Sequence, residues 1–257
     1  MIIVYSGTGN TLHIARLLAA ELDMRVLHLR GDELLNPSAI SAGRDEPVIW
    51  AFPVYSWGVP PVVRRYMREC GFEGSAAHAV HHALITYGDD AGLTGSQWRD
   101  EIMARGLRPG GVYGVQMPNT YVFMPGMDVD SGEVAEAKIR DAGLAVARIA
   151  AEIRGNAAGV WEDNYKKGSF AWLKSRVIRP WFERHCMSDR HYHATHDCTG
   201  CGRCVSVCPM LNIRLDEGKP RWGGRCAMCL ACYHVCPHHA VAYKGITKKK
   251  GQKRLLK

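Results

Sequence analysis

Residues 5–15 read YSGTGNTLHIA and join a short apolar run, residues 2–6, to an amphipathic run, residues 10–22. This pattern predicts a buried strand, a glycine-rich turn and a helix, and such a turn is where α/β proteins hold phosphate groups. The Walker phosphate loop is excluded, because it requires a lysine that this turn lacks. The dinucleotide fingerprint is excluded as well, because Leu12 replaces its third glycine and the second strand ends in Arg30 rather than an acidic residue.

The remaining turn, SGTGNT, offers hydroxyl and amide side chains together with the backbone N–H groups of a helix start. These groups can surround a terminal monophosphate without a basic residue, and the helix dipole favours the anion. The turn resembles the [ST]-x-T-G-x-T loop of flavodoxin-like proteins, which binds the phosphate of FMN. A capped helix beside an empty loop is the alternative. The resemblance implies FMN as a cofactor and a phosphate site formed by Ser6, Gly7, Thr8, Gly9, Asn10 and Thr11.

Strand and helix patterns alternate through residues 1–154, which we expect to form the first domain. Apolar, β-branched runs predict five strands, at residues 2–6, 24–29, 48–54, 79–87 and 111–117. Helical periodicity predicts helices at residues 10–22, 60–69, 92–106 and 131–154, whereas the signal in residues 31–46 is weak. This alternation is typical of a doubly wound parallel α/β sheet with both faces covered. The resemblance implies a five-stranded flavodoxin-like sheet in the order 2-1-3-4-5.

The loops after the third, fourth and fifth predicted strands read FPVYSWGVPP, TYGDDAGLTG and MPNTYVFMPG. All three carry aromatic residues beside glycine or proline, and in a flavodoxin-like sheet they lie at the carboxyl edge, where ligands bind. We expect this edge to hold the isoalloxazine ring, with Tyr55, Trp57 and Tyr87 as the stacking or lining residues. The backbone near Gly58 and Gly88 would contact the polar edge of the ring. The expected flavin-contacting residues in these loops are Pro53, Val54, Tyr55, Ser56, Trp57, Gly58, Thr86, Tyr87, Gly88 and Asp89.

Residues 198–209 and 226–237 form an internal repeat, CTGCGRCVSVCP and CAMCLACYHVCP. Both halves read C-x2-C-x2-C-x3-C-P, a spacing in which three cysteines surround one iron–sulfur cube and the fourth reaches the other. Zinc sites lack this doubled pattern, and disulfides do not fit a cytosolic chain. We therefore expect two [4Fe-4S] clusters. One would be bound by Cys198, Cys201, Cys204 and Cys236, and the other by Cys226, Cys229, Cys232 and Cys208.

The cysteine repeat resembles bacterial-type two-cluster ferredoxins. The resemblance implies a small α+β ferredoxin domain at residues 191–245, with a hairpin that turns near Glu217-Gly218. Together with FPVYSWGVPP and MPNTY, it makes nearly the whole chain similar to a family of fusions between a flavodoxin-like domain and a two-cluster ferredoxin. These fusions are typical of anaerobic bacteria.

Residues 155–190 are expected to connect the two domains through an amphipathic helix, which Pro180 should kink or end. We expect this helix to pack one domain on the other; a basic helix on a membrane surface is the alternative. Residues 246–257 form a basic tail that we expect to be solvated.

The composition fits a globular cytoplasmic protein. Of the 257 residues, 47% are apolar, and no apolar run approaches the length of a membrane span. No signal peptide is visible, since Met1 leads directly into the first predicted strand. Residues 155–257 carry a net charge of +12 and residues 1–154 one of −4, but eight cluster-bound thiolates would offset part of the positive charge. We therefore expect no nucleic-acid partner.

Some cysteines and histidines lie outside these motifs. Cys70 and Cys186 are expected to be buried or incidental thiols. Histidines cluster at residues 81–82, 191–196 and 238–239. A metal site at residues 191–196 is one interpretation; solvated histidines, or histidines that shield the nearby cluster, are the interpretation we favour.

The combination of two one-electron clusters and a two-electron flavin predicts an electron-transfer protein that serves redox partner proteins as donor and acceptor. The alternative is an FMN-dependent reductase of a small molecule, fed by its own clusters, with a proton donor such as Tyr87, Tyr121 or His13. A third class, a cluster-bearing regulator with a vestigial flavin site, is disfavoured by the intact glycine-rich turn. No feature of the sequence selects an oligomeric state.

Overall fold

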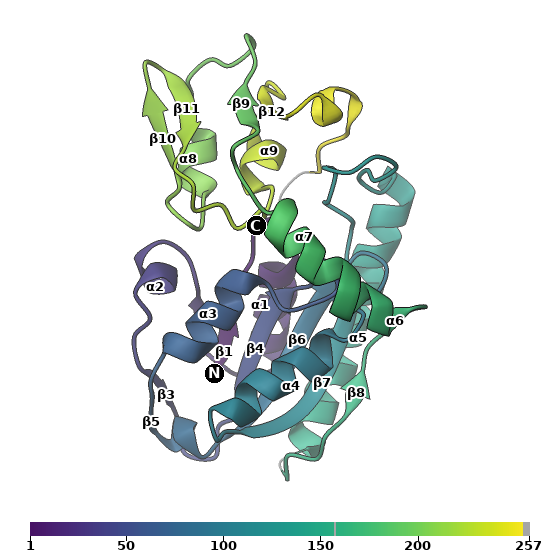
Figure 1. Cartoon of the computed structure of the whole chain (residues 1–257). Helices are drawn as coiled ribbons and strands as arrows, with labels where there is room; N and C mark the ends of the chain where they lie inside the picture. Colours follow the sequence, from purple (N-terminus) through teal and green to yellow (C-terminus); the bar gives the residue numbers. More distant parts are fainter. Residues whose placement is uncertain (157, 254–257) are drawn as a thin grey trace.

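The computed structural model describes residues 1–156 and 158–253, and its larger part is built on a six-stranded parallel sheet (Figure 1). The strands lie in the order β2-β1-β4-β6-β7-β8, and each neighbouring pair is parallel. Their bounds are Ile2–Val4 for β1, Val26–His28 for β2, Val48–Pro53 for β4, Val80–Tyr87 for β6, Arg108–Gln116 for β7 and Asp163–Asn164 for β8.

The five strands predicted from the sequence lie side by side, but the sheet is not the five-stranded one expected. β8 adds a sixth strand, because Asp163 pairs with Val112 at the free edge of β7. The segment with a weak sequence signal supplies β3 (Ile40–Ala42), which pairs with β5 (Phe72–Gly74) in a separate sheet. Strands of two or three residues show too little alternation for the sequence pattern to reveal them.

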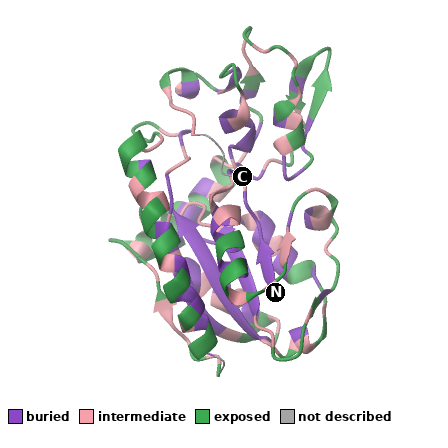
Figure 2. Cartoon of the chain, turned by 180° about the vertical axis from the view of Figure 1, so that it is seen from behind, coloured by how far each residue is buried: buried purple, intermediate pink, exposed green. Residues whose placement is uncertain are grey.

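Helices cover both faces of the large sheet (Figures 1 and 2). α3 (Pro61–Glu69) and α4 (Thr94–Ala104) pack on one face, and α1 (Asn10–Leu22) and α5 (Gly132–Gly155) pack on the other. β1 and β6 are buried over their whole lengths, as expected for a parallel sheet between two helical layers. Two short elements, α2 (Asp32–Leu35) and η1 (Ser75–Ala77), lie in connecting loops.

The C-terminal region lies beyond the carboxyl ends of the large sheet and contains two antiparallel strand pairs (Figure 1). β9 (Tyr192–Ala194) pairs with β12 (Val241–Tyr243), and β10 (Ile213–Asp216) pairs with β11 (Lys219–Trp222). The predicted hairpin turn is confirmed, since Glu217 and Gly218 join β10 to β11 and both have a positive φ.

Each half of the cysteine repeat contains one short helix. α8 (Arg203–Val207) lies in the first half and α9 (Ala231–Val235) in the second, and η3 (Ile246–Lys249) follows β12. The C-terminal region is therefore a small α+β unit, as expected.

The connector forms one continuous helical rod that packs on the sheet part. It consists of α6 (Ala171–Leu173), a π-helical turn η2 (Lys174–Ile178) and α7 (Arg179–His185). Pro180 does not end the rod, because the wider π turn before it accommodates the proline ring and the missing N–H. Ser175, Arg179 and Phe182 are buried, whereas Trp172 on the outward side is 65% exposed.

Aromatic packing fastens the C-terminal region to the sheet part. Phe123, in the loop after β7, stacks on Tyr243 with ring centroids 4.5 Å apart and meets Tyr192 and Tyr233 edge-on. His234 of α9 faces the carbonyl oxygen of Thr120 through Nε2, at 2.8 Å.

The described part of the basic tail is partly packed, which corrects the expectation of a wholly solvated tail, although Lys248 and Lys249 are exposed. Lys250 donates to the carbonyl oxygen of Met127 at 2.6 Å, and the Lys253 N–H donates to Nδ1 of His234 at 3.1 Å. Residues 254–257, the rest of the predicted tail, lie outside the described residues. In the part of the chain that the structure describes, every helix is too short or too polar to cross a membrane.

Candidate cofactor sites

A cavity of about 420 Å³ lies at the carboxyl ends of β1, β4, β6 and β7. Sites for small ligands commonly measure about 300–1,000 Å³. Fourteen of the sixteen residues expected to contact a flavin line this cavity, and Gly9 and Gly58 do not. The fourteen are Ser6, Gly7, Thr8, Asn10, Thr11, Pro53, Val54, Tyr55, Ser56, Trp57, Thr86, Tyr87, Gly88 and Asp89.

The glycine-rich turn closes one end of the cavity, and α1 begins directly after it. Gly9 has a φ of 90°, which glycine adopts without strain, and its N–H donates to the Ser6 hydroxyl at 3.2 Å. Within the described chain, the backbone N–H groups of Thr8, Asn10 and Thr11 donate to no protein acceptor, and the first turn of α1 carries no acidic residue. These groups and the helix dipole are free to bind an anion.

Besides Ser6, which accepts from the Gly9 N–H, two more of the four polar side chains in the turn are engaged by the protein itself. The Asn10 amide donates to the carbonyl oxygen of Pro118 at 2.9 Å, and the hydroxyls of Thr11 and Thr86 share a hydrogen bond of 2.7 Å. Asn10 and Thr11 thus hold the turn against the loops after β6 and β7. The Thr8 hydroxyl and the Ser6 O–H remain for a ligand.

The loop after β4 makes a tight turn whose two central residues are strained. Ser56 and Trp57 have φ values of 45° and 57°, and the Ser175 hydroxyl supports the turn by donating to the Trp57 carbonyl at 2.9 Å. Gly58 lies outside the cavity, because the Arg179 guanidinium occupies the space where a Cβ would stand. Gly58 therefore packs against the connector helix, contrary to the expectation that its backbone faces the ligand.

The loop after β6 presents an acceptor that the sequence interpretation missed. The carbonyl groups of Gly88 and Asp89 already accept hydrogen bonds from the Gln116 side chain, at 3.1 and 3.3 Å. Their neighbour Asp90 also lines the cavity; its Oδ2 accepts from Lys174 at 2.6 Å, and its Oδ1 is buried without a partner in the described chain. A buried carboxylate oxygen requires a donor, and none in the described chain reaches Oδ1.

Segments far from the glycine-rich turn form the rest of the cavity wall. Five methionines contribute flexible apolar surface, and Tyr121 and the connector helix complete the wall. The helical spacing of apolar residues in the connector predicts a face that packs on another part of the chain. No sequence pattern indicates that this face also lines a ligand cavity. The loop after the fifth predicted strand, expected at this edge, contributes Met117, Pro118, Asn119, Thr120, Tyr121 and Met124. Besides Asp90, the lining residues that the sequence did not indicate are Met127, Lys174, Ile178, Trp181, Phe182, Met187, Met228, Cys229 and Leu230.

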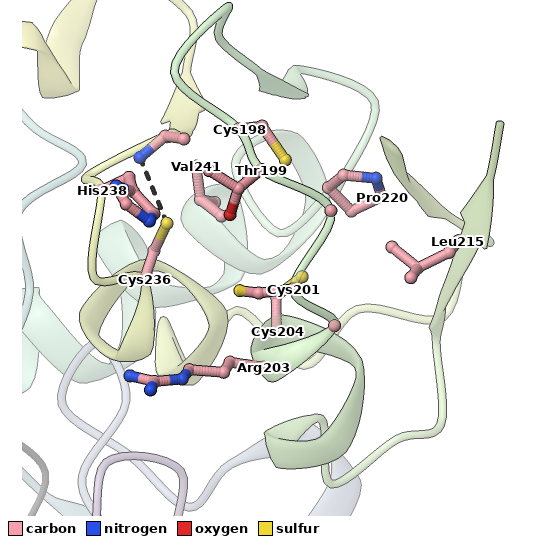
Figure 3. A pocket seen from close by; sticks show the side chains of 13 residues that line it. Cys198, Thr199, Cys201, Arg203, Cys204, Leu215, Pro220, Cys236, His238 and Val241 are labelled. Atoms are coloured by element: carbon pink, nitrogen blue, oxygen red, sulfur yellow. Dashed lines mark hydrogen bonds between the residues drawn. The ribbon is translucent and has the colours of Figure 1, made fainter. Parts of the chain in front are cut away.

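Four cysteines, here called the outer set, surround a second pocket near the surface (Figure 3). Cys198, Cys201 and Cys204 come from the first half of the repeat and Cys236 from the second, which is the grouping expected from the spacing. Cys201 is exposed. The side-chain donors that line the pocket, Thr199, Arg203 and His238, are also exposed to water.

The remaining four motif cysteines, here called the inner set, surround a third pocket. They are Cys208, Cys226, Cys229 and Cys232, again three from one half of the repeat and one from the other. Cys229 and Leu230 line both this pocket and the large cavity. A Cβ at Gly7 would stand only 2.5 Å from the Cβ of Cys229, so the glycine allows the two parts of the chain to meet.

The chemistry of both sets fits iron–sulfur clusters. Burial raises the pKa of the Cys229 thiol to about 11 and that of the Cys232 thiol well above its usual value. Such groups become thiolates when a metal binds them. No group of three or more potential ligands in the described residues is close enough to hold a single ion. Thiolates around a four-iron cube stand farther apart than those around one zinc ion.

The buried donors near the inner set also fit a cluster. Tyr192 Oη and Trp222 Nε1 are buried at this pocket and have no hydrogen-bond partner in the described chain. Cluster sulfur atoms are acceptors that would satisfy them.

The other histidines and cysteines form no further site among the described residues. His81 and His82 lie in the core of β6, where Nδ1 of His81 accepts from the Trp50 indole at 3.0 Å and burial lowers both pKa values to about 4. The histidines at 191, 193 and 196 are exposed. Cys70 is buried and Cys186 half-buried.

Comparisons with known proteins identify the C-terminal region. Residues 197–241 match the model of the 4Fe-4S dicluster domain family. The motif cysteines in residues 198–236 thus bind iron–sulfur clusters, and this part of the chain has the chemistry of electron transfer. No curated protein matches the chain. Among solved structures, the Trp repressor binding protein from Bacillus subtilis is 16% identical, with a TM-score of 0.36 over 58% of this chain and 96% of its own.

Proposed function

We propose that this chain is an electron-transfer protein that binds FMN in the large cavity of a flavodoxin-like domain and one [4Fe-4S] cluster at each cysteine set. One observation carries the proposal: Cys229 lines the inner pocket and the large cavity at once, and it touches the phosphate-type turn at Gly7. A flavin and the inner cluster would therefore be neighbours. Iron–sulfur clusters exchange single electrons and FMN can carry two, so the pair converts between the two kinds of step.

Four features support FMN as the ligand. The cavity has the volume of a small-ligand site, and its closed end offers the hydroxyls of Ser6 and Thr8 with free N–H groups for a phosphate. Aromatic rings line the space beyond this end. The order of the five main strands is also that of flavodoxin-like sheets.

The two cysteine sets differ in exposure, and this difference indicates which set a redox partner protein would contact. The outer set has an exposed cysteine and lines no part of the cavity, whereas the inner pocket shares Cys229 and Leu230 with the cavity wall. A redox partner protein would thus exchange electrons at the outer set. Thiolate ligands of this kind persist in a reducing compartment, which favours the cytoplasm.

A reductase of a small apolar molecule is the second function that the cavity favours. Beyond the strand-end loops, its wall contains Met124, Met127, Trp181, Phe182 and Met187, a surface suited to an apolar substrate. Tyr87 and Tyr121 line the cavity as possible proton donors, but His13 does not. Burial raises the pKa of both Tyr87 and Tyr121, which opposes a role of either as an acid.

Anaerobic reconstitution of the full chain, with FMN, iron and sulfide counted per chain, tests the proposal. We expect one FMN and about eight irons, from two four-iron clusters. Thr8→Trp should remove FMN and keep all iron, because the bulky ring fills the phosphate site, and Thr8→Ser, which keeps the hydroxyl, should bind FMN. Absence of FMN or a content near four irons would refute the proposal. Turnover with artificial donors separates the two functions: a carrier reduces many acceptors, a reductase one.

A further inference from the structure

Three buried donors with no partner in the described chain gather around the inner set. Besides Tyr192 Oη and Trp222 Nε1, the Tyr5 hydroxyl is buried; it lies near Tyr55 and the Cys229 thiol, and no acceptor in the described chain meets it with hydrogen-bond geometry. Trp222 lies beside Cys232, and Tyr5 lies beside Cys229. The three come from separate segments, since Tyr5 follows β1, Tyr192 begins β9 and Trp222 ends β11.

Buried donors without an acceptor are rare in native proteins, because such a donor loses its bond to water and gains nothing. Tyr192 and Trp222 line the inner pocket and Tyr5 lies beside Cys229, so an acceptor bound by the inner set would satisfy donors from three separate segments. The Tyr192 and Trp222 rings stack with centroids 5.2 Å apart, so each restricts the orientation of the other. The outer set differs, because its side-chain donors are exposed and water can satisfy them.

We propose that Tyr5, Tyr192 and Trp222 donate hydrogen bonds to sulfur atoms of the inner cluster and thereby raise its reduction potential. The inference rests on cluster binding at the inner set. Reduction adds one electron, and hence one negative charge, to the cluster. A hydrogen bond to sulfur is stronger in the more negative state, so each donor favours the reduced form. The three residues tune the cluster and hold it in place; they are positioning residues.

The test replaces each donor by phenylalanine, which keeps a ring and removes the hydrogen. Potentials of both clusters are measured on the full chain in an anaerobic titration followed by electron paramagnetic resonance. Trp222→Phe, Tyr192→Phe and Tyr5→Phe should each lower the reduction equilibrium constant of the inner cluster by about two- to tenfold. Tenfold corresponds to about 59 mV for one electron. The outer cluster should not change. Cys201→Ser, which removes an outer ligand, identifies the signal of the inner cluster.

Two matched controls come from the same chain. Trp98 Nε1 and Tyr113 Oη are also buried without partners, but neither residue lines a cysteine pocket. Trp98→Phe and Tyr113→Phe should therefore leave both potentials unchanged. If they shift the inner potential as much as Trp222→Phe does, the effect is general loosening of the fold and the proposal is wrong.

A second measurement does not depend on the stability of the variants. In the reduced wild-type chain, electron–nuclear double resonance should detect exchangeable protons coupled to the inner cluster that disappear slowly in D2O, as expected of buried donors. Absence of such protons, or unchanged potentials in variants with full iron content, would overturn the proposal. A wild-type chain that binds no inner cluster would instead refute the proposed function.

Discussion

The outer and inner cysteine sets have the same spacing in sequence but different surroundings in the fold. The outer set faces solvent and has exposed polar neighbours. The inner set is covered by the sheet part through Gly7 and Tyr5 and by the aromatic pair Tyr192 and Trp222. Two copies of one motif can therefore provide two cluster environments, because distant segments rather than the motif determine what surrounds each cluster.

The largest expected contrast comes from removing one ligand in each set. Cys229→Ala should remove the inner cluster, about half of the iron, and should stop the reduction of flavin by electrons that enter at the outer set. Cys201→Ala should remove only the outer cluster and leave FMN and the inner cluster in place. Iron content and stopped-flow reduction with dithionite measure both effects. Equal rates of flavin reduction in wild type and Cys229→Ala would contradict the arrangement.

The second contrast concerns the contact between the inner set and the glycine-rich turn. Gly7→Ala places a Cβ within 2.5 Å of the Cβ of Cys229, so the turn or the cysteine loop must move. We expect at least about tenfold weaker FMN binding, since a shift near 1 Å disrupts a phosphate site. The outer cluster should be unaffected.

Gly143→Ala is the control for this substitution, because a Cβ at this helical glycine meets nothing within 4 Å. A fluorescence titration with FMN provides the measurement. Equal affinities of the two variants would show that the contact at Gly7 does not matter to the flavin.

These contacts explain which features the sequence could predict. Strands such as β6, the glycine-rich turn before α1 and both cysteine groupings follow from local patterns, because spacing and burial act over a few neighbouring residues. The cavity wall could not be predicted in the same way: Lys174 meets Asp90 only after the connector folds back over the sheet.

Local rules described two positions only in part. The sequence predicts that Pro180 kinks or ends its helix, and in the structure the helical segment continues past a π turn directly before it. Gly58 suggested a ligand contact, but its missing side chain makes room for Arg179. This contact forms only when the connector folds back over the sheet, so distance in sequence hides it.

A smaller contrast concerns the residues at equivalent positions of α8 and α9, the short helices in the two halves of the repeat. His234 of α9 contacts the Thr120 carbonyl and accepts from the Lys253 N–H, whereas the equivalent Ser206 of α8 is exposed. His234→Ala should lower the free energy of unfolding by about 1–3 kcal/mol, because it leaves buried groups without partners. Ser206→Ala should change it by less than about 0.5 kcal/mol. Anaerobic thermal unfolding of the cluster-loaded chain measures the difference, and equal losses would contradict a special role for α9.

The smallest expected contrast is in the rate at which each cluster loses iron, which tests only how accessible each cysteine set is to solvent. A strong iron chelator reaches a cluster only when the surrounding chain opens, and opening is easier where few buried contacts must break. The outer set has an exposed cysteine, but the inner set has none: two of its cysteines are buried and two half-buried, beside the buried Met228 and Leu230. Iron should therefore leave in two phases of similar size, with the outer cluster lost on the order of tenfold faster. Loss of iron in one phase would mean that both sets open together, in one cooperative event. If the inner signal disappeared first, the inner pocket would have a route to solvent that its burial does not explain, and the outer set could not be the entry point for electrons.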